Sequence, residues 1–133
     1  MLPEVGKYIR LAFESRGVIF TLEITPPDGR LEVDVMRMEG EEPWVSVTFP
    51  KDPEGERAVR RFFTRNGLQV PEDSGTPPSF FPNLPVELIY YISPLPRDAA
   101  GVSALIADLF RECGRLENDA PLRIHIEEAS DAA

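Results

Sequence analysis

Four arginines in segment 53–66 form the most prominent group of side chains that could bind a ligand. Arg57, Arg61 and Arg65 recur every four residues, and Arg60 lies beside them. At this spacing the side chains share one face of a helix, where they could bind an anion such as phosphate, an acidic peptide or nucleic acid. The alternative is an ordinary solvated face, because acidic residues at a helix start and basic residues toward its end suit the helix dipole.

A second candidate contact region is the proline-rich segment 68–85. Five of the 14 prolines of the chain fall in this segment, and Phe80 and Phe81 are adjacent within it. Two neighbouring aromatic side chains in such a loop either anchor it to the core or present an apolar patch to a partner. Whether Phe80 and Phe81 are buried would distinguish these two interpretations.

The residue types needed for most metal and nucleophilic chemistry are scarce. The chain has one His and one Cys, whereas a structural zinc site takes about four such ligands. Cys113 falls on the apolar stripe of an expected helix and His125 on the polar side of the last expected strand, which argues against a catalytic Cys–His pair. Glycine-rich phosphate-binding motifs and nucleophile motifs are missing. We therefore expect no enzyme activity, no metal and no cofactor.

Three carboxylates occupy polar positions of two expected strands on either side of a turn at 26–29. They are Glu23, Glu32 and Asp34. Antiparallel pairing about the turn would bring Glu23 close to Glu32. Carboxylates on an open sheet face are normally solvated, and only burial would raise one pKa enough for acid–base catalysis. We therefore interpret them as part of a solvated surface.

Charge excludes several classes of partner. The 133 residues include 14 Lys and Arg against 23 Asp and Glu, a formal net charge of −9. Such a chain repels nucleic-acid backbones and anionic membranes, so neither is expected as a partner. Residues 68–133 carry 4 basic and 11 acidic side chains, which favours solubility or a basic partner. One cysteine, no leader pattern at the start and no membrane-spanning apolar run predict a cytoplasmic protein.

The periodicity of apolar residues predicts three helices, each with one apolar stripe. Proline or aspartate stands at their starts, and glycine follows their ends, as helix capping favours. Their expected ranges are 3–16, 53–66 and 99–113. On the last helix, small residues beside the stripe could pack within the chain or against a second subunit. They are Ala100, Ala104 and Ala107.

Alternation of apolar and polar residues predicts strands. Three short ones before residue 50 are separated by turns, which is typical of an antiparallel meander. The alternation slips at 36–38, indicating a bulge or a strand end. Segment 86–93 is apolar on both sides, so we expect a central strand covered on both faces. A final strand is expected at 122–127, and a further short one at 68–70 or 79–81.

These elements predict a single α+β domain over residues 1–127, followed by an acidic flexible tail at 128–133. The order is α-β-β-β-α-(β)-β-α-β, with three helices packed on an antiparallel or mixed sheet of four to six strands. In order, size and acidity the chain is similar to small acidic secretion chaperones, which are usually dimers. The similarity involves no residue motif and implies fold more than function.

The leading hypothesis is a non-enzymatic protein-binding domain, of the adaptor or chaperone-like kind, that forms a homodimer. Acidity, the absence of catalytic motifs and the Phe80–Phe81 loop support it. The alternative hypothesis is a domain that binds a small anionic ligand, or a modest enzyme. Arg57, Arg60, Arg61 and Arg65 would then form its site.

Overall fold

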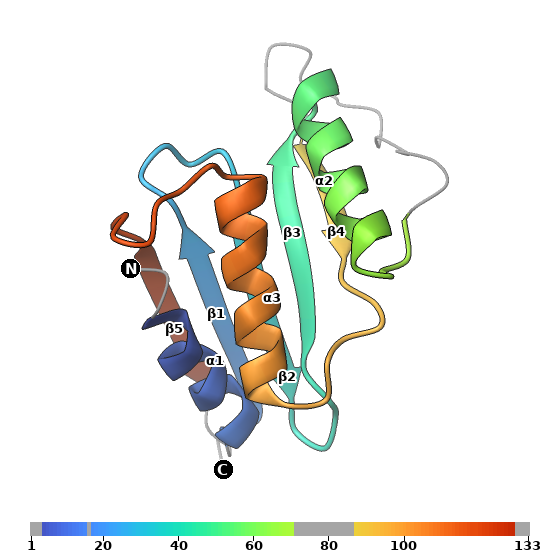
Figure 1. Cartoon of the computed structure of the whole chain (residues 1–133). Helices are drawn as coiled ribbons and strands as arrows, with labels where there is room; N and C mark the ends of the chain where they lie inside the picture. Colours follow the sequence, from blue (N-terminus) through green and yellow to red (C-terminus); the bar gives the residue numbers. More distant parts are fainter. Residues whose placement is uncertain (1–3, 16, 71–86, 130–133) are drawn as a thin grey trace, which may run out of the picture.

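The computed structural model describes residues 4–15, 17–70 and 87–129 of the chain. Within these ranges, three helices and five strands form one α+β domain, so the fold class expected from the sequence is confirmed. The helices lie together over one face of the sheet (Figure 1). None of the described helices is long and apolar enough to cross a membrane. In chain order the elements are α1 (Val5–Glu14), β1 (Ile19–Thr25), β2 (Glu32–Met38), β3 (Trp44–Pro50), α2 (Pro53–Arg65), β4 (Glu87–Tyr91), α3 (Ala99–Glu112) and β5 (Arg123–Ala129).

The sheet has the strand order β4-β3-β2-β1-β5, and each neighbouring pair is antiparallel. β1, β2 and β3 form the expected meander. Gly29 and Gly40, in the two turns, have φ values of 69° and 80°, a region that residues with a Cβ rarely enter. β5 lies beside β1 at the far edge and extends to Ala129, past the domain boundary expected at 127.

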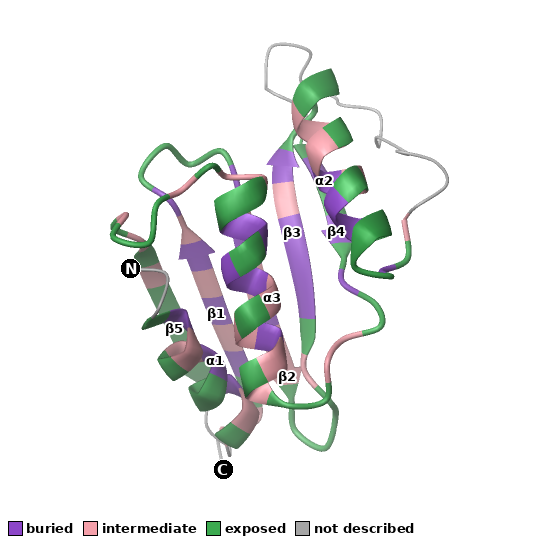
Figure 2. Ribbon diagram, in the orientation of Figure 1, coloured by how far each residue is buried: buried purple, intermediate pink, exposed green. Residues whose placement is uncertain are grey.

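The side chains that face the helices form the hydrophobic core. Leu22, Val35 and Val47, on three neighbouring strands, are all 0% exposed. Phe63 of α2 packs edge-on against Tyr90 of β4, with ring centroids 5.6 Å apart. Figure 2 shows the buried residues along the helix surfaces and strands that meet one another. Apolar burial between the helices and one sheet face therefore supplies the main stabilisation of the domain.

The capping residues of α2 and α3 are those that the sequence indicates. The Oδ1 atom of Asp52 accepts a hydrogen bond from the backbone N–H of Glu54 at 3.2 Å. Asp98 Oδ1 accepts one from Gly101 at 2.7 Å. These bonds satisfy N–H groups that the start of a helix leaves without partners. Pro53 then occupies the first turn of α2, where the missing N–H of proline costs nothing.

β4 corrects one expectation from the sequence. Segment 86–93 was expected to hold a central strand, yet β4 is the last strand of the sheet in the described ranges. Leu88 and Tyr90 are buried against the helices, whereas Ile89 and Tyr91 are each 56% exposed on the other face. One side of this strand is therefore covered by the helices, and the apolar residues on its other side form an exposed surface.

The slipped alternation at 36–38 marks the end of a strand, not a bulge. β2 ends at Met38, and its register with β1 is unbroken. Arg37 takes an inward position, and its Nη1 atom donates to the carbonyl oxygens of Phe13 at 2.9 Å and Ser15 at 2.6 Å. A charged residue fits there because it satisfies carbonyls that the C-terminal end of α1 leaves without helical partners.

The optional short strand is not present at 68–70. Instead, the backbone N–H of Gln69 donates to the carbonyl oxygen of Ser93, just after β4, at 2.7 Å. The other possible position, 79–81, and the tail beyond Ala129 lie outside the described residues. The single bond at Gln69 ties the end of the segment after α2 to the end of β4.

Candidate functional site

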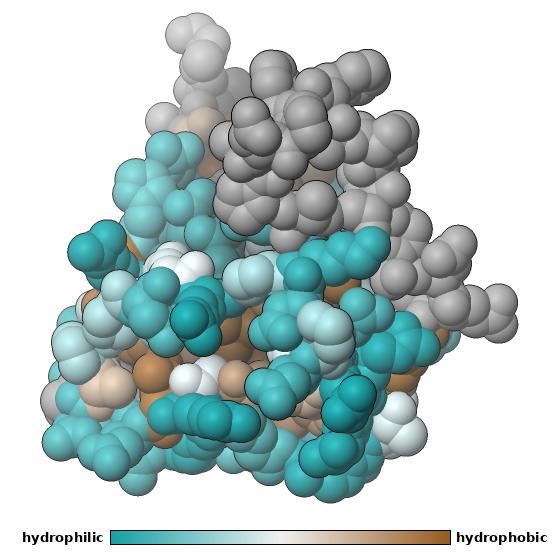
Figure 3. Space-filling model, turned by 90° about the horizontal axis from the view of Figure 1, so that it is seen from above, coloured by the Kyte–Doolittle hydropathy of each residue, from teal (hydrophilic) through white to brown (hydrophobic). Residues whose placement is uncertain are grey.

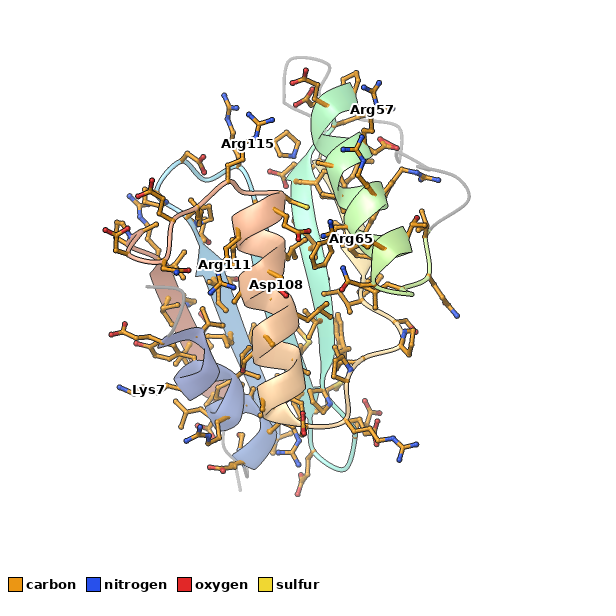
Figure 4. The ribbon with its side chains drawn as sticks, viewed as in Figure 1. Lys7, Arg57, Arg65, Asp108, Arg111 and Arg115 are labelled. Carbon is orange, nitrogen blue, oxygen red and sulfur yellow. The ribbon has the colours of Figure 1, made fainter. Side chains whose placement is uncertain are left out.

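The four arginines predicted as an anion site all line one cavity, of about 890 Å³, over the solvent side of α2. They face outward because the opposite side of the helix is buried by Val59, Phe62 and Phe63. Figure 4 shows Arg57 and Arg65 toward opposite ends of α2, with Arg65 beside α3. The residues that line the cavity are Lys51, Asp52, Pro53, Glu56, Arg57, Arg60, Arg61, Thr64 and Arg65. Sequence spacing found the arginines but missed Lys51, which precedes the helix.

Two of the arginines have partners within the domain. Arg65 forms an ion pair with Glu112 of α3, and its guanidinium lies 5.8 Å from the centre of the Phe62 ring. Arg60 donates from Nη1 to the hydroxyl oxygen of Tyr90 at 3.1 Å. Tyr90 is itself 2% exposed, so Arg60 is held to the core through this hydroxyl. These two arginines therefore have structural roles within the domain.

Arg57 and Arg61 differ from that pair. Both are exposed, and neither forms an ion pair or hydrogen bond with a residue that the structure describes. They stand one helical turn apart, where like charges destabilise a helix by a few tenths of a kcal/mol, roughly 0.2–0.5. A small anion between them would offset this repulsion.

The uncovered face of the sheet brings the three predicted carboxylates together. In the register of β1 and β2, Glu23 lies directly opposite Asp34, whereas Glu32 lies on the diagonal. Antiparallel pairing about the turn therefore brings Glu23 and Glu32 near each other as expected, with Asp34 as the residue directly opposite Glu23. On its other side, Asp34 faces Ser46 of β3, which is 5% exposed. We call Glu23, Glu32 and Asp34 the acidic cluster.

Within the acidic cluster, the carboxyl of Asp34 has a raised pKa. The pKa of Asp34 is raised from 3.8 to about 7, first by burial and then by a hydrogen bond with Glu32 and the charges of Glu32 and Glu23. Its Oδ1 atom is buried without a hydrogen-bond partner. A carboxyl of this kind can gain or lose a proton near neutral pH. In the described ranges, no group of three or more His, Cys, Asp and Glu residues could hold a metal ion.

An exposed apolar surface lies beside the acidic cluster on the same face. Ile89 and Tyr91 of β4 are each 56% exposed, and Trp44 of β3 is 38% exposed. The rings of Trp44 and Tyr91 are in contact, with centroids 5.6 Å apart. We call these three residues the aromatic patch. The sequence pattern placed them on strands but did not indicate that their face is uncovered.

Cys113 and His125 lie apart, on different sides of the domain. The Cys113 thiol, between α3 and α2, is 3.6 Å from the carbonyl oxygen of Ala58. Burial raises its pKa to about 11, with an opposing effect from Arg65, so the thiol stays protonated near neutral pH. His125 is exposed on β5, and a hydrogen bond with Glu127 raises its pKa. The geometry does not bring the thiol and the imidazole together.

The remaining predicted contact residues divide between buried, exposed and undescribed positions. Phe80 and Phe81 lie outside the described residues, so their role stays a prediction. On α3, Ala107 is buried, whereas Ala100 and Ala104 are exposed. Seen from above, the end of the domain has a mainly hydrophilic surface with apolar side chains between (Figure 3).

Searches against protein-family models, curated proteins and solved structures found no match to this chain. Function is therefore inferred from the two surfaces just described, the aromatic patch with its acidic cluster and the cavity over α2.

Proposed function

We propose that this chain is a non-enzymatic protein-binding domain, of the adaptor or chaperone-like kind, that binds a segment of another protein on the uncovered face of its sheet. The aromatic patch is the observation that supports this function. Large exposed apolar side chains on one surface are typical of sites that bind a partner protein. Tryptophan and tyrosine are enriched among the interface residues that contribute most of the binding free energy. Trp44 and Tyr91 already contact each other, so little side-chain ordering is needed on binding.

The charges on this face favour a basic partner segment. The acidic cluster lies on β1 and β2, beside the aromatic patch on β3 and β4. Neighbouring strands are about 4.8 Å apart, so the two groups are separated by roughly 10–15 Å, the reach of about four residues of extended chain. A short segment with apolar anchors at one end and Lys or Arg at the other fits both groups.

A second copy of this chain fits the same face less well. Each copy has a formal net charge of −9 and would bring its own acidic cluster to the contact. Like charges in an interface oppose association. The homodimer expected from the sequence stays a prediction, and its test is the mass of the protein in solution.

Selection of random peptides displayed on phage tests the proposal. We expect the selected peptides to combine aromatic or aliphatic residues with Lys or Arg. Trp44 is the only tryptophan of the chain and belongs to the patch, so its fluorescence should change as these peptides bind. Substitution of Ile89 or Tyr91 by serine should weaken binding about tenfold or more, as expected at central interface positions.

Leu11→Ser is the matched control for these variants. Leu11 is an apolar residue of α1, 45% exposed and away from the uncovered face. Binding that is lost in Leu11→Ser and kept in Tyr91→Ser would overturn the proposal, as would selection of acidic peptides. A dimer in sedimentation equilibrium that Tyr91→Ser dissociates would instead assign the face to a second copy.

A further inference from the structure

The cavity over α2 lies on the other side of the domain from the aromatic patch and is independent of the proposed protein binding. We propose that this cavity binds a small phosphorylated molecule, with a phosphate held between Arg57 and Arg61. Both guanidinium groups line the cavity, one helical turn apart. Arginine is well suited to phosphate because its planar fork can donate two parallel hydrogen bonds to phosphate oxygens.

The charge around the cavity supports an anionic ligand. Its lining includes five basic side chains and two acidic ones, in a chain whose formal net charge is −9. Of the two acids, Asp52 is occupied in capping α2, and Glu56 lies 3.5 Å from the hydroxyl of Tyr90. Arg57 and Arg61 therefore lack a neutralising carboxylate within the described residues. A bound phosphate would supply that missing negative charge.

The open cavity has room for a molecule larger than a free phosphate ion. Its volume of about 890 Å³ lies within the range of sites for drug-sized molecules, roughly 300–1,000 Å³. The second carboxylate oxygens of Asp52 and Glu56, which those bonds do not use, and the hydroxyl of Thr64 can accept hydrogen bonds from ligand hydroxyl or amino groups. A phosphate ester with such groups, for example a sugar phosphate, fits the arginines and these acceptors together.

The same observations disfavour a macromolecular polyanion. Nucleic acid or a long acidic peptide would extend beyond the four arginines onto a domain with excess negative charge, and such contacts are repulsive. In addition, Arg65 is paired with Glu112 and Arg60 is bound to Tyr90. Arg57 and Arg61 are therefore the two arginines of the cavity with no partner among the described residues, and a pair one turn apart suits a compact anion.

Calorimetric titration of the full chain at constant ionic strength tests this site. The probes are ribose 5-phosphate, inorganic phosphate, ribose and sulfate. We expect saturable binding of ribose 5-phosphate, weaker binding of inorganic phosphate, and none of ribose. Arg57→Gln and Arg61→Gln should each weaken binding of ribose 5-phosphate by about tenfold or more, as loss of a charge-assisted hydrogen bond implies.

Arg10→Gln is the matched control, because Arg10 is an exposed arginine on the helix α1. Its affinity for ribose 5-phosphate should equal that of the unsubstituted chain. The proposal is overturned if sulfate binds as tightly as ribose 5-phosphate, if none of the phosphates binds saturably, or if Arg57→Gln behaves like Arg10→Gln. Tighter binding of a single-stranded oligonucleotide that depends on the same two arginines would also overturn it. None of these results depends on peptide binding at the aromatic patch.

Discussion

The helix-covered face of the sheet and its uncovered face belong to the same strands but hold different side chains. On the covered face, strand residues such as Val35 and Val47 are fully buried. On the other face, β1 and β2 carry the acidic cluster, and β3 and β4 carry the aromatic patch. The covered face therefore supplies the apolar core, while the other face presents charged and aromatic groups to solvent.

An apolar residue on a strand of this sheet can therefore belong either to the core or to an exposed surface. Tyr90 and Tyr91 are neighbours of the same residue type, yet their exposed fractions are 2% and 56%. Only the first contributes to the core. Substitutions on the two faces should therefore have different effects, on stability for the covered face and on binding for the other.

The largest effect is expected for Phe63→Ala on the covered side. Phe63 is 0% exposed and packs on Tyr90, so its truncation leaves a cavity that the surrounding residues fill poorly. We expect the free energy of unfolding to fall by about 3–5 kcal/mol. Urea denaturation followed by circular dichroism measures this change. A loss below about 1 kcal/mol would show that the covered face is not the main core.

Arg37→Gln should have the next largest effect, because it removes the charged donor from the C-terminal end of α1. Its two hydrogen bonds to main-chain carbonyls should make its loss cost about 1–3 kcal/mol. Amide hydrogen exchange should also become faster in α1. Arg30→Gln, at an exposed turn position, is the control. Equal stability of the two variants would contradict the role assigned to Arg37.

Asp34→Asn should stabilise the domain in a pH-dependent way. Burial, and after it the neighbouring Glu32 and Glu23, raise the pKa of Asp34 from 3.8 to about 7 in the folded protein. Its protonated form therefore favours folding at low pH, and this contribution is lost as pH rises from 3.8 to about 7. Above that pH the folded chain holds a partly buried charge. Asparagine removes this penalty, with a gain of about 1–2 kcal/mol at pH 8 after allowance for partial exposure, and little change at pH 4.

Urea denaturation at several pH values measures the effect of Asp34→Asn. The control is Asp119→Asn, at an exposed carboxylate after α3. A gain for Asp34→Asn that is the same at pH 4 and pH 8 would show that charge burial is not its cause.

The smallest effect on stability is expected for Tyr91→Ser on the uncovered face. Tyr91 is 56% exposed, so its replacement should change the free energy of unfolding by less than about 1 kcal/mol. The same variant should lose binding of the selected peptides. Thermal unfolding and the fluorescence titration, made on one preparation, compare the two properties. A large loss of stability would show that Tyr91 belongs to the core.

Local sequence patterns predicted much of this molecule because helices and strands depend on nearby residues. The caps at Asp52 and Asp98 and the outward position of the α2 arginines follow from local spacing, as does the meander. The edge position of β4 did not follow, because strand order depends on contacts between distant segments. The sequence also left open whether the slip at 36–38 is a bulge or a strand end, because the partners of Arg37 lie on another element.

For the candidate sites, residue spacing was enough to predict which side chains share a face, and composition gives the net charge of −9. Three features appear only once the chain is folded: Asp34 lies opposite Glu23 and is partly buried, Tyr90 holds Arg60, and Tyr91 is exposed with no described helix over it. The physical reason is that periodicity is a property of one segment, whereas burial, register and electrostatic coupling arise only when segments pack together.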